Sequence, residues 1–145
     1  MAITFRYVHV PRKDGTLRKA PFIPIYANTL DGKTIRIIAL LDSGADTTVV
    51  PKEIAELLGL KELQKEMDTG GIGGKVKVKE SRMQFWLDGQ HEKHQMNIPV
   101  LIMQDINEDM PVILGRQGFF ENFDIIFRQN EEKITLKKVQ SKRMF

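Results

Sequence analysis

The stretch ALLDSGADTTVVP, from Ala39 to Pro51, ends a run of aliphatic residues with an aspartate, a serine and a glycine. The residues from Ile35 to Leu41 are almost continuously apolar, which predicts a strand that is covered on both faces. A carboxylate that follows a buried strand is costly unless it is hydrogen-bonded, paired or used. Asp42 is therefore the first candidate functional residue, and Ser43 and Gly44 form a small turn through which backbone amides can approach it.

The length of the chain limits the kind of site that Asp42 can join. A chain of 145 residues fits one domain, and it is too short for two full-sized lobes. A site that needs two symmetric halves therefore requires a second copy of the chain. There are no cysteines, which excludes disulfides and thiolate metal sites and suits a reducing compartment.

The apolar runs are all shorter than the roughly 18 residues that span a bilayer, and the N-terminus lacks a signal-peptide core. We therefore expect a soluble cytoplasmic protein with no membrane partner. The formal net charge is +3, and basic residues gather in PRKDGTLRKA (Pro11 to Ala20) and KKVQSKRMF (Lys137 to Phe145). We interpret both segments mainly as solvated surface and expect no nucleic-acid partner. A protein that binds nucleic acid through its basic ends is the alternative.

Short β segments separated by turns make up most of the pattern. Asp-Gly pairs at residues 14–15, 31–32 and 88–89 predict hairpin turns. FIPIYANTLDGKTIRIIALL, from Phe22 to Leu41, is thus predicted to be a hairpin whose second arm runs directly into Asp42. MQFWLDGQHEKHQMNIPVLIM, from Met83 to Met103, is predicted to be another hairpin.

One helix is expected, in PKEIAELLGL. Pro51 can occupy its first turn and Gly59 can cap its end. Its predicted apolar stripe consists of Ile54, Leu57 and Leu58.

Three further segments complete the pattern. TGGIGGKVKVKE, residues 69–80, combines a glycine cluster with Val/Lys alternation, which indicates a turn that feeds a half-exposed strand. PVILGRQGFFENFDIIF, residues 111–127, predicts a buried strand, a tight turn, a short helical piece and a strand. ITLKK, residues 134–138, predicts a last strand.

Three of these motifs together resemble a known family. LLDSGADTTVVP, GGIGG and VILGRQGF occur in the order and character seen in retropepsins, the retroviral-type aspartic proteases. The resemblance covers roughly residues 22–128. It implies a single all-β domain over residues 1–145, with a closed barrel-like sheet, a flap hairpin, one or two short helices and extensions at both ends of the core.

The resemblance also implies roles for residues of the first motif. Asp42 matches the catalytic aspartate, Ser43 the hydroxyl residue that ties two catalytic loops together, and Gly44 the glycine whose carbonyl faces substrate. Ala45 and Asp46 match substrate-binding positions that border the cleft.

The other two motifs match the flap and the support of the catalytic loop. Gly71, Ile72 and Gly73 would lie at the flap, where Ile72 presses on bound peptide. Arg116 matches an arginine that pairs with the cleft aspartate, and Gly115 belongs to the same supporting strand. Val49 and Ile113 could line the substrate subsites, but an ordinary place in the hydrophobic core explains each of them at least as well.

The chemistry that follows is peptide hydrolysis without a metal or cofactor. Two carboxylates held close together can share one proton, because like charges at hydrogen-bonding distance separate their pKa values. A homodimer that places Asp42 beside its twin on a two-fold axis supplies that pair. The expected substrate is a polypeptide in extended conformation.

Several alternatives were weighed. Asp68 of MDTGG also begins an Asp-Thr-Gly and could pair with Asp42 within one chain, but no apolar strand precedes it, and a turn position is expected. The glycine cluster fails the phosphate-loop and dinucleotide patterns. His91 and His94 lack a clear further metal ligand. A peptide-binding or dimerisation module that kept the fold without turnover is the second functional hypothesis.

The ends of the chain depart from the compact retroviral enzymes. The section before the catalytic motif is longer, and the chain begins with its own methionine, so we expect a free-standing cellular relative. Terminal strands often bind the two subunits together in that family. This part of the dimer interface is therefore left open by the resemblance.

Overall fold

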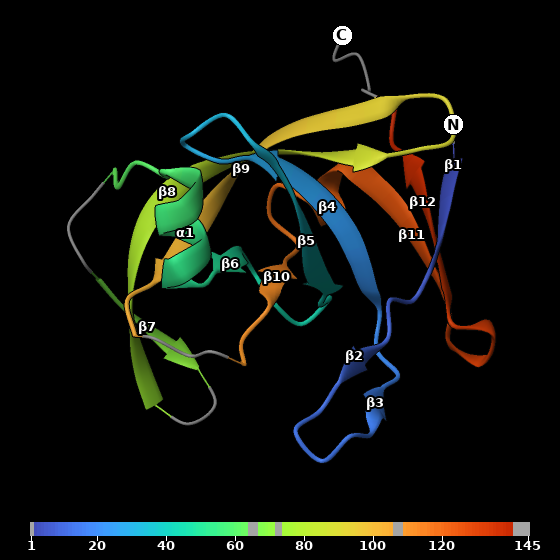
Figure 1. The fold of residues 1–145 in the computed structure, drawn as a ribbon, viewed down its shortest axis with the longest axis horizontal. Helices are drawn as coiled ribbons and strands as arrows, with labels where there is room; N and C mark the ends of the chain where they lie inside the picture. The colour runs from blue at the N-terminus through green and yellow to red at the C-terminus, as the bar shows by residue number, and fades with distance from the viewer. Residues whose placement is uncertain (1, 64–66, 72–73, 106–108, 141–145) are drawn as a thin grey trace, which may run out of the picture.

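The computed structural model describes residues 2–63, 67–71, 74–105 and 109–140 (Figure 1). Nearly all regular structure in these residues is β. The elements are β1 (Ala2–Arg6), β2 (Val10–Pro11), β3 (Leu17–Arg18), β4 (Phe22–Asn28), β5 (Thr34–Leu41), β6 (Thr48–Val50), α1 (Lys52–Leu58), β7 (Met67–Gly71), β8 (Gly74–Asp88), β9 (Lys93–Met103), β10 (Val112–Leu114), η1 (Phe120–Asn122), β11 (Phe123–Arg128), η2 (Gln129–Glu131) and β12 (Lys133–Lys138).

Six strands form a closed barrel. They follow the order β4-β5-β10-β6-β9-β8, and β7 continues the sheet beyond β8. The barrel closes where Tyr26 of β4 pairs with Trp86 of β8. The aromatic rings of these two residues stack with their centroids 6.1 Å apart. The expected all-β fold with a closed barrel-like sheet is confirmed.

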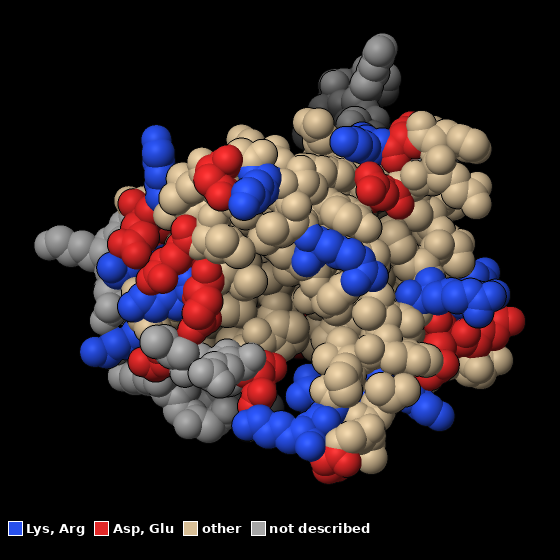
Figure 2. Space-filling view, in the orientation of Figure 1, with Lys and Arg blue, Asp and Glu red and all other residues tan. Residues whose placement is uncertain are grey.

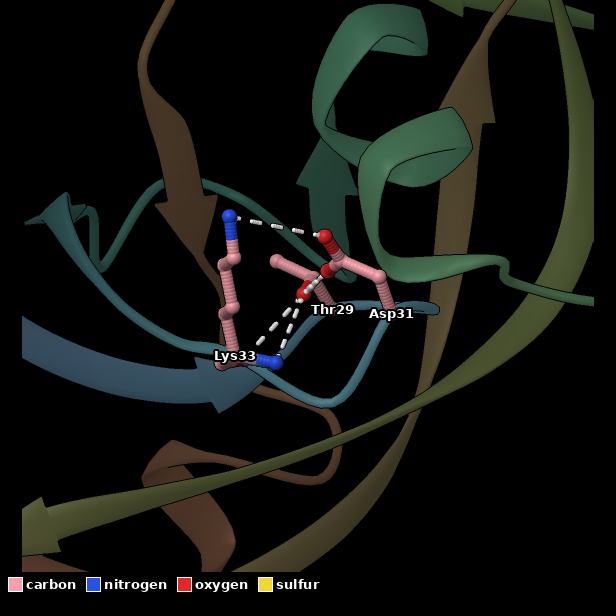
Figure 3. A network of polar contacts seen from close by, with 3 residues as sticks. All are labelled: Thr29, Asp31 and Lys33. Carbon is pink, nitrogen blue, oxygen red and sulfur yellow. Dashed lines mark hydrogen bonds and ion pairs between the residues drawn. The ribbon is translucent and has the colours of Figure 1, made fainter.

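The hairpin of β4 and β5 turns through the predicted Asp-Gly pair (Figure 3). Gly32 has a φ of 84°, a left-handed conformation that favours glycine. The Thr29 hydroxyl donates to the Asp31 carboxylate, and the Lys33 amide donates to the Thr29 hydroxyl oxygen at 3.1 Å. The turn is thus held by its own side chains, which fixes the register of the strand that leads to the candidate site.

Strand β5 is covered on both faces, as its composition predicts. Ile37, Ala39 and Leu41 are buried in the barrel core. Ile38 and Leu40 on the other face are half-buried. The strand that precedes Asp42 is therefore a rigid support rather than a surface segment.

Helix α1 is shorter than the segment predicted to form it, and its buried face differs from the predicted apolar stripe. Gly59 caps it in the left-handed conformation, as predicted, whereas Pro51 lies at the N-cap. Ala55 is buried, and Leu57, expected in the apolar stripe, is 48% exposed. Because successive helical residues are about 100° apart, a face centred between Ile54, Ala55 and Leu58 turns Leu57 toward solvent.

The two ends of the chain meet in a second sheet of order β1-β12-β11. Ile3, Ile134 and Leu136 of this sheet are buried. Strand β11 is the outer strand on one side and has a neighbour only on its β12 edge among the described residues. A small β2–β3 hairpin projects from the body between β1 and β4 (Figure 1).

None of the helices in the described part of the chain is long and apolar enough to cross a membrane.

Candidate active site

Asp42 lies directly after β5, where two loops meet. Its backbone amide donates to the Leu114 carbonyl oxygen at 3.0 Å, so the end of β5 is tied to the end of β10. The Gly44 amide donates to Oδ1 of Asp42 at 2.9 Å, and the Ala45 amide donates to the Asp42 carbonyl oxygen at 3.1 Å. The half-buried carboxylate is therefore oriented by backbone that the turn itself provides.

Gly44 is needed because its backbone lies so close to the carboxylate. A Cβ at this position would lie 3.2 Å from Asp42 Oδ1, which is tighter than ordinary contact. Ser43 and Gly44 are both exposed in the single chain. The side of the turn that carries the carboxylate is consequently open to another molecule.

The segment after β10 interlocks with the segment after Asp42. The Gly115 amide donates to the buried Thr48 hydroxyl at 3.2 Å, and the Arg116 amide donates to the Ala45 carbonyl oxygen at 2.9 Å. A Cβ on Gly115 would lie 2.6 Å from the carbonyl group of Thr47. The two loops therefore pack through backbone with no room for a side chain, while the predicted role of Gly115 in supporting the site stays a prediction.

Asp46 and Arg116 meet as the resemblance implies. The Arg116 guanidinium donates to Oδ1 of Asp46. Both side chains are well exposed, at 56% for Arg116 and 84% for Asp46. The contact exists in the single chain, while the predicted roles of Asp46 toward substrate and Arg116 in site support stay predictions.

The glycine-rich segment forms the hairpin that was expected. Strands β7 and β8 pair in antiparallel register from Met67 opposite Val78 to Gly71 opposite Gly74. Ile72 and Gly73, the predicted flap tip, lie outside the described residues.

Asp68, expected in a turn, instead lies within β7 opposite Lys77. The interpretation as a turn residue was wrong, because the strand pairing of this hairpin extends through the glycines.

Two supporting groups were not identified in the sequence. The Thr48 hydroxyl is fully buried and accepts from Gly115, and the Gln117 amide donates to the Asp46 carbonyl oxygen at 2.8 Å. Nothing in the local pattern marks Gln117, whereas a threonine in the run Asp46 to Val50 is a weak signal for a buried hydroxyl with a partner. Val49 and Ile113 are half-buried and lie opposite each other in the sheet.

His91 lies between β8 and β9, and His94 lies at the start of β9. His94 pairs with Glu92 at 3.1 Å, and its ring packs edge-on against Phe123. Within the described residues, no three histidine, aspartate or glutamate side chains gather in a way that would hold a metal ion.

Comparison with known proteins identifies related sequences and folds. A sequence family described as aspartyl protease matches residues 27–117, a range that includes both interlocking loops. A comparison with curated proteins finds no significant match.

Two solved structures have the same fold at low sequence identity. A retropepsin-like aspartic protease from Rickettsia conorii is 17% identical, with a TM-score of 0.54 over 94% of this chain and 98% of that chain. The retroviral protease-like domain of Ddi1 from Leishmania major is 16% identical, with a TM-score of 0.52 over 81% of this chain and 88% of that one.

Proposed function

Because this chain belongs to the aspartyl protease family, we propose that it is an aspartic endopeptidase that is active as a homodimer. The proposal rests on the Asp42 carboxylate, which directly follows a buried strand. Its Oδ1 accepts a hydrogen bond from the Gly44 amide at 2.9 Å. A carboxylate placed in this way, beside the exposed Ser43 and Gly44, suits a reaction at a protein surface or cleft.

A second copy is needed because one chain contains one Asp-Ser-Gly element. The nearby carboxylate of Asp46 is occupied by Arg116, and Asp68 belongs to a strand of the β7–β8 hairpin. Two Asp42 residues on a two-fold axis would share one proton, so that one is ionised and the other is neutral. The open side of the Asp42 turn is the side on which the twin would lie.

The reaction follows from that shared proton. The ionised carboxylate takes a proton from a water molecule, whose oxygen attacks the peptide carbonyl carbon, while the neutral carboxylic acid gives its proton to the carbonyl oxygen. In the second step the carboxylic acid gives its proton to the nitrogen, and the other carboxylate takes a proton from a hydroxyl group of the tetrahedral intermediate. The carbon–nitrogen bond then breaks to release an amine and a carboxylic acid, and the pair again holds one proton. Asp42 of each subunit is the catalytic residue.

The outer strand β11 supports association of two chains. Ile126 is 49% exposed and Phe127 is 41% exposed, on a strand whose outer edge has no neighbour among the described residues. Exposed apolar edge strands are a liability in a monomer, because their backbone groups pair readily with other strands. A second β11 is the partner that we propose for this edge.

The substrate that we propose is an extended polypeptide. It would lie between the β7–β8 hairpin and the loop that carries Ala45 and Asp46, and it would add main-chain hydrogen bonds in the manner of a strand. Val49 and Ile113 are half-buried aliphatic residues of paired strands, and they favour apolar side chains next to the cut bond.

The test is cleavage of a complex peptide mixture by the wild type and by Asp42→Asn over about pH 4 to 7, with products read by mass spectrometry. We expect cuts by the wild type alone. Asn keeps the size of Asp42 and an oxygen that can accept from Gly44, so circular dichroism should show the same fold for both proteins. Cleavage by both variants would exclude Asp42 as the catalytic group. Binding of peptides without cleavage by either would favour the peptide-binding module.

A further inference from the structure

The β2–β3 hairpin ends beside the strand that leads to the candidate active site. Pro21, which follows this hairpin, accepts a hydrogen bond from the Leu41 amide through its carbonyl oxygen at 3.0 Å. Leu41 is the residue before Asp42. Since Lys19 precedes Pro21 by two residues, at most about 7 Å of chain separates it from this contact.

The tip of the hairpin contacts a second segment that leads to the site. Lys13 Nζ lies 3.1 Å from Oδ2 of Asp109, three residues before β10. Strand β10 in turn pairs with the end of β5 at Leu41. The hairpin is therefore attached at its base to the end of β5 and at its tip to the segment that precedes β10. In Figure 1 it projects on the same side as the loop after β5.

The hairpin is strongly basic. Residues 12–19 contain four cations, Arg12, Lys13, Arg18 and Lys19, and one carboxylate, Asp14. This excess of three positive charges equals the formal excess of the entire chain. Figure 2 shows Lys and Arg side chains on both sides of the hairpin, next to a recess in the surface.

The carboxylate of Asp14 stabilises the turn of the hairpin through hydrogen bonds. Asp14 accepts hydrogen bonds from the Thr16 hydroxyl at 2.6 Å and from the Thr16 amide at 2.9 Å, and these bonds lower the pKa of Asp14. Arg18 and Lys19 have no ion-pair partner within the described ranges. Their charges are thus available to a ligand, while Asp14 holds the hairpin in shape.

Resting on the proposed function, we propose that the β2–β3 hairpin is a wall of the substrate cleft that selects peptides with acidic side chains flanking the cut bond. The cations of Arg18 and Lys19 at the base contact the peptide, and Lys13 at the tip exchanges its exposed pair with Asp109 for a substrate carboxylate. Such an exchange costs little because exposed ion pairs contribute little to stability.

The position of the acidic residue follows from strand geometry. Two residues and one hydrogen bond connect the Lys19 backbone to Leu41, the residue before Asp42, so these two residues lie at most about 12 Å apart. An extended peptide rises about 3.3 Å per residue, so its third or fourth residue from the cut lies about 10 to 13 Å away. In a two-fold dimer the second hairpin stands at the other end of the cleft. Acidic residues are then preferred on both sides of the cut.

The experiment compares two matched peptides that carry either Glu or Gln at the third and fourth positions on each side of a cleaved bond. The values of kcat/KM are measured for the wild type, for Arg18→Gln/Lys19→Gln, and for Lys137→Gln/Lys138→Gln as a control that removes two exposed cations elsewhere. We expect the wild type to prefer the Glu peptide by about tenfold, at two- to fivefold per charge contact. The preference should shrink between about 20 mM and 200 mM salt, because exposed charges are screened.

The hairpin variant should lose the preference for the Glu peptide over the Gln peptide, while the control keeps it. An unchanged preference in the hairpin variant, or no preference in the wild type, would overturn the proposal. Failure of the wild type to cut either peptide counts against the proposed function instead. Binding of the two peptides to Asp42→Asn, with and without the Arg18 and Lys19 substitutions, then decides the role of the hairpin.

Discussion

The guanidinium of Arg116 donates to the carboxylate of Asp46, and so joins by side chains two loops that backbone hydrogen bonds already join. The Arg116 amide donates to the Ala45 carbonyl oxygen at 2.9 Å, and the Gln117 amide to the Asp46 carbonyl oxygen at 2.8 Å. The side-chain pair is exposed, at 56% for Arg116 and 84% for Asp46. Because an exposed ion pair contributes little to stability, we expect this pair to position Asp46 more than it stabilises the fold.

Replacing Arg116 by Ala should separate these two effects. We expect the free energy of unfolding to fall by less than about 1 kcal/mol, as is usual for an exposed ion pair. The value of kcat/KM should fall roughly 10- to 100-fold, because a small displacement of a substrate-positioning group is costly. Urea unfolding and peptide cleavage measure the two quantities.

The matched control for this substitution is Lys33→Ala, which removes another exposed cation, whose Nζ lies 3.8 Å from Oδ2 of Asp31. It should leave cleavage unchanged. Equal losses of activity in both variants would show that Arg116 has no positioning role. A loss of stability of several kcal/mol in Arg116→Ala would show that the pair is a structural bond.

Gly115 should tolerate no side chain. A Cβ there would lie 2.6 Å from Thr47 backbone atoms and 2.9 Å from the Ala45 carbonyl oxygen, and backbone at a crossing of two loops cannot give way. We expect Gly115→Ala to lower the free energy of unfolding by about 1–3 kcal/mol, the usual cost of overpacking. Gly89→Ala, whose Cβ would meet its nearest atoms at 3.3 and 3.4 Å, should cost much less in the same urea titration. Similar midpoints for the two variants would contradict the close packing.

The local pattern was sufficient to predict the barrel hairpins and the helix end. The Asp31-Gly32 turn, the apolar run before Asp42 and the cap at Gly59 are each determined by residues close in sequence. The interlocking of the loops at Asp42 and Gly115 was available only through the resemblance. Their contacts join residues that are about 70 positions apart in the sequence, and the local hydrophobic pattern cannot predict such contacts.

Other features depend on packing that a single segment does not encode. Strand β1 pairs with β12, so that Thr4 lies opposite Thr135, and neither strand has a signal for its partner. The basic segment Pro11 to Ala20 reads as solvated surface, and nothing in its pattern indicates that Lys13 pairs with Asp109 or that Pro21, directly after it, accepts from the Leu41 amide. The exposure of Leu57 likewise follows from how α1 is rotated on the barrel.

Tyr7 should make stability depend on alkaline pH. Its hydroxyl donates to Oε1 of Gln129 at 2.9 Å, and burial, together with the charge of Glu132, raises the pKa of Tyr7 above its ordinary value of 10.0. The neutral phenol is thus favoured in the folded state. This contribution is fully present below pH 10 and is lost as pH rises through the folded pKa.

The test compares wild type and Tyr7→Phe in urea between about pH 8 and pH 11. At pH 8 the variant should be less stable by about 1 kcal/mol, because it lacks the hydrogen bond to Gln129. The difference should shrink above pH 10, since ionisation of Tyr7 destabilises the wild type alone. A constant difference over the whole range would contradict the raised pKa.

The outer edge of β11 should decide whether two chains associate. Phe127→Asp replaces an apolar side chain of this strand, which is 41% exposed, by a charged one. If the edge is the interface, loss of a central aromatic contact should cost about 2 kcal/mol or more, which is roughly a 30-fold rise in the dissociation constant. Sedimentation should then show monomers at concentrations where the wild type is dimeric, and kcat per chain should recover as protein concentration rises.

Leu57→Asp is the matched control, because Leu57 is 48% exposed on α1 and lies outside the second sheet. It should leave both sedimentation and cleavage unchanged. Dimers of Phe127→Asp with wild-type affinity would move the interface away from β11. Full cleavage activity of monomeric Phe127→Asp would instead exclude a site shared between two Asp42 carboxylates, because a lone Asp42 cannot act as acid and base in the same step.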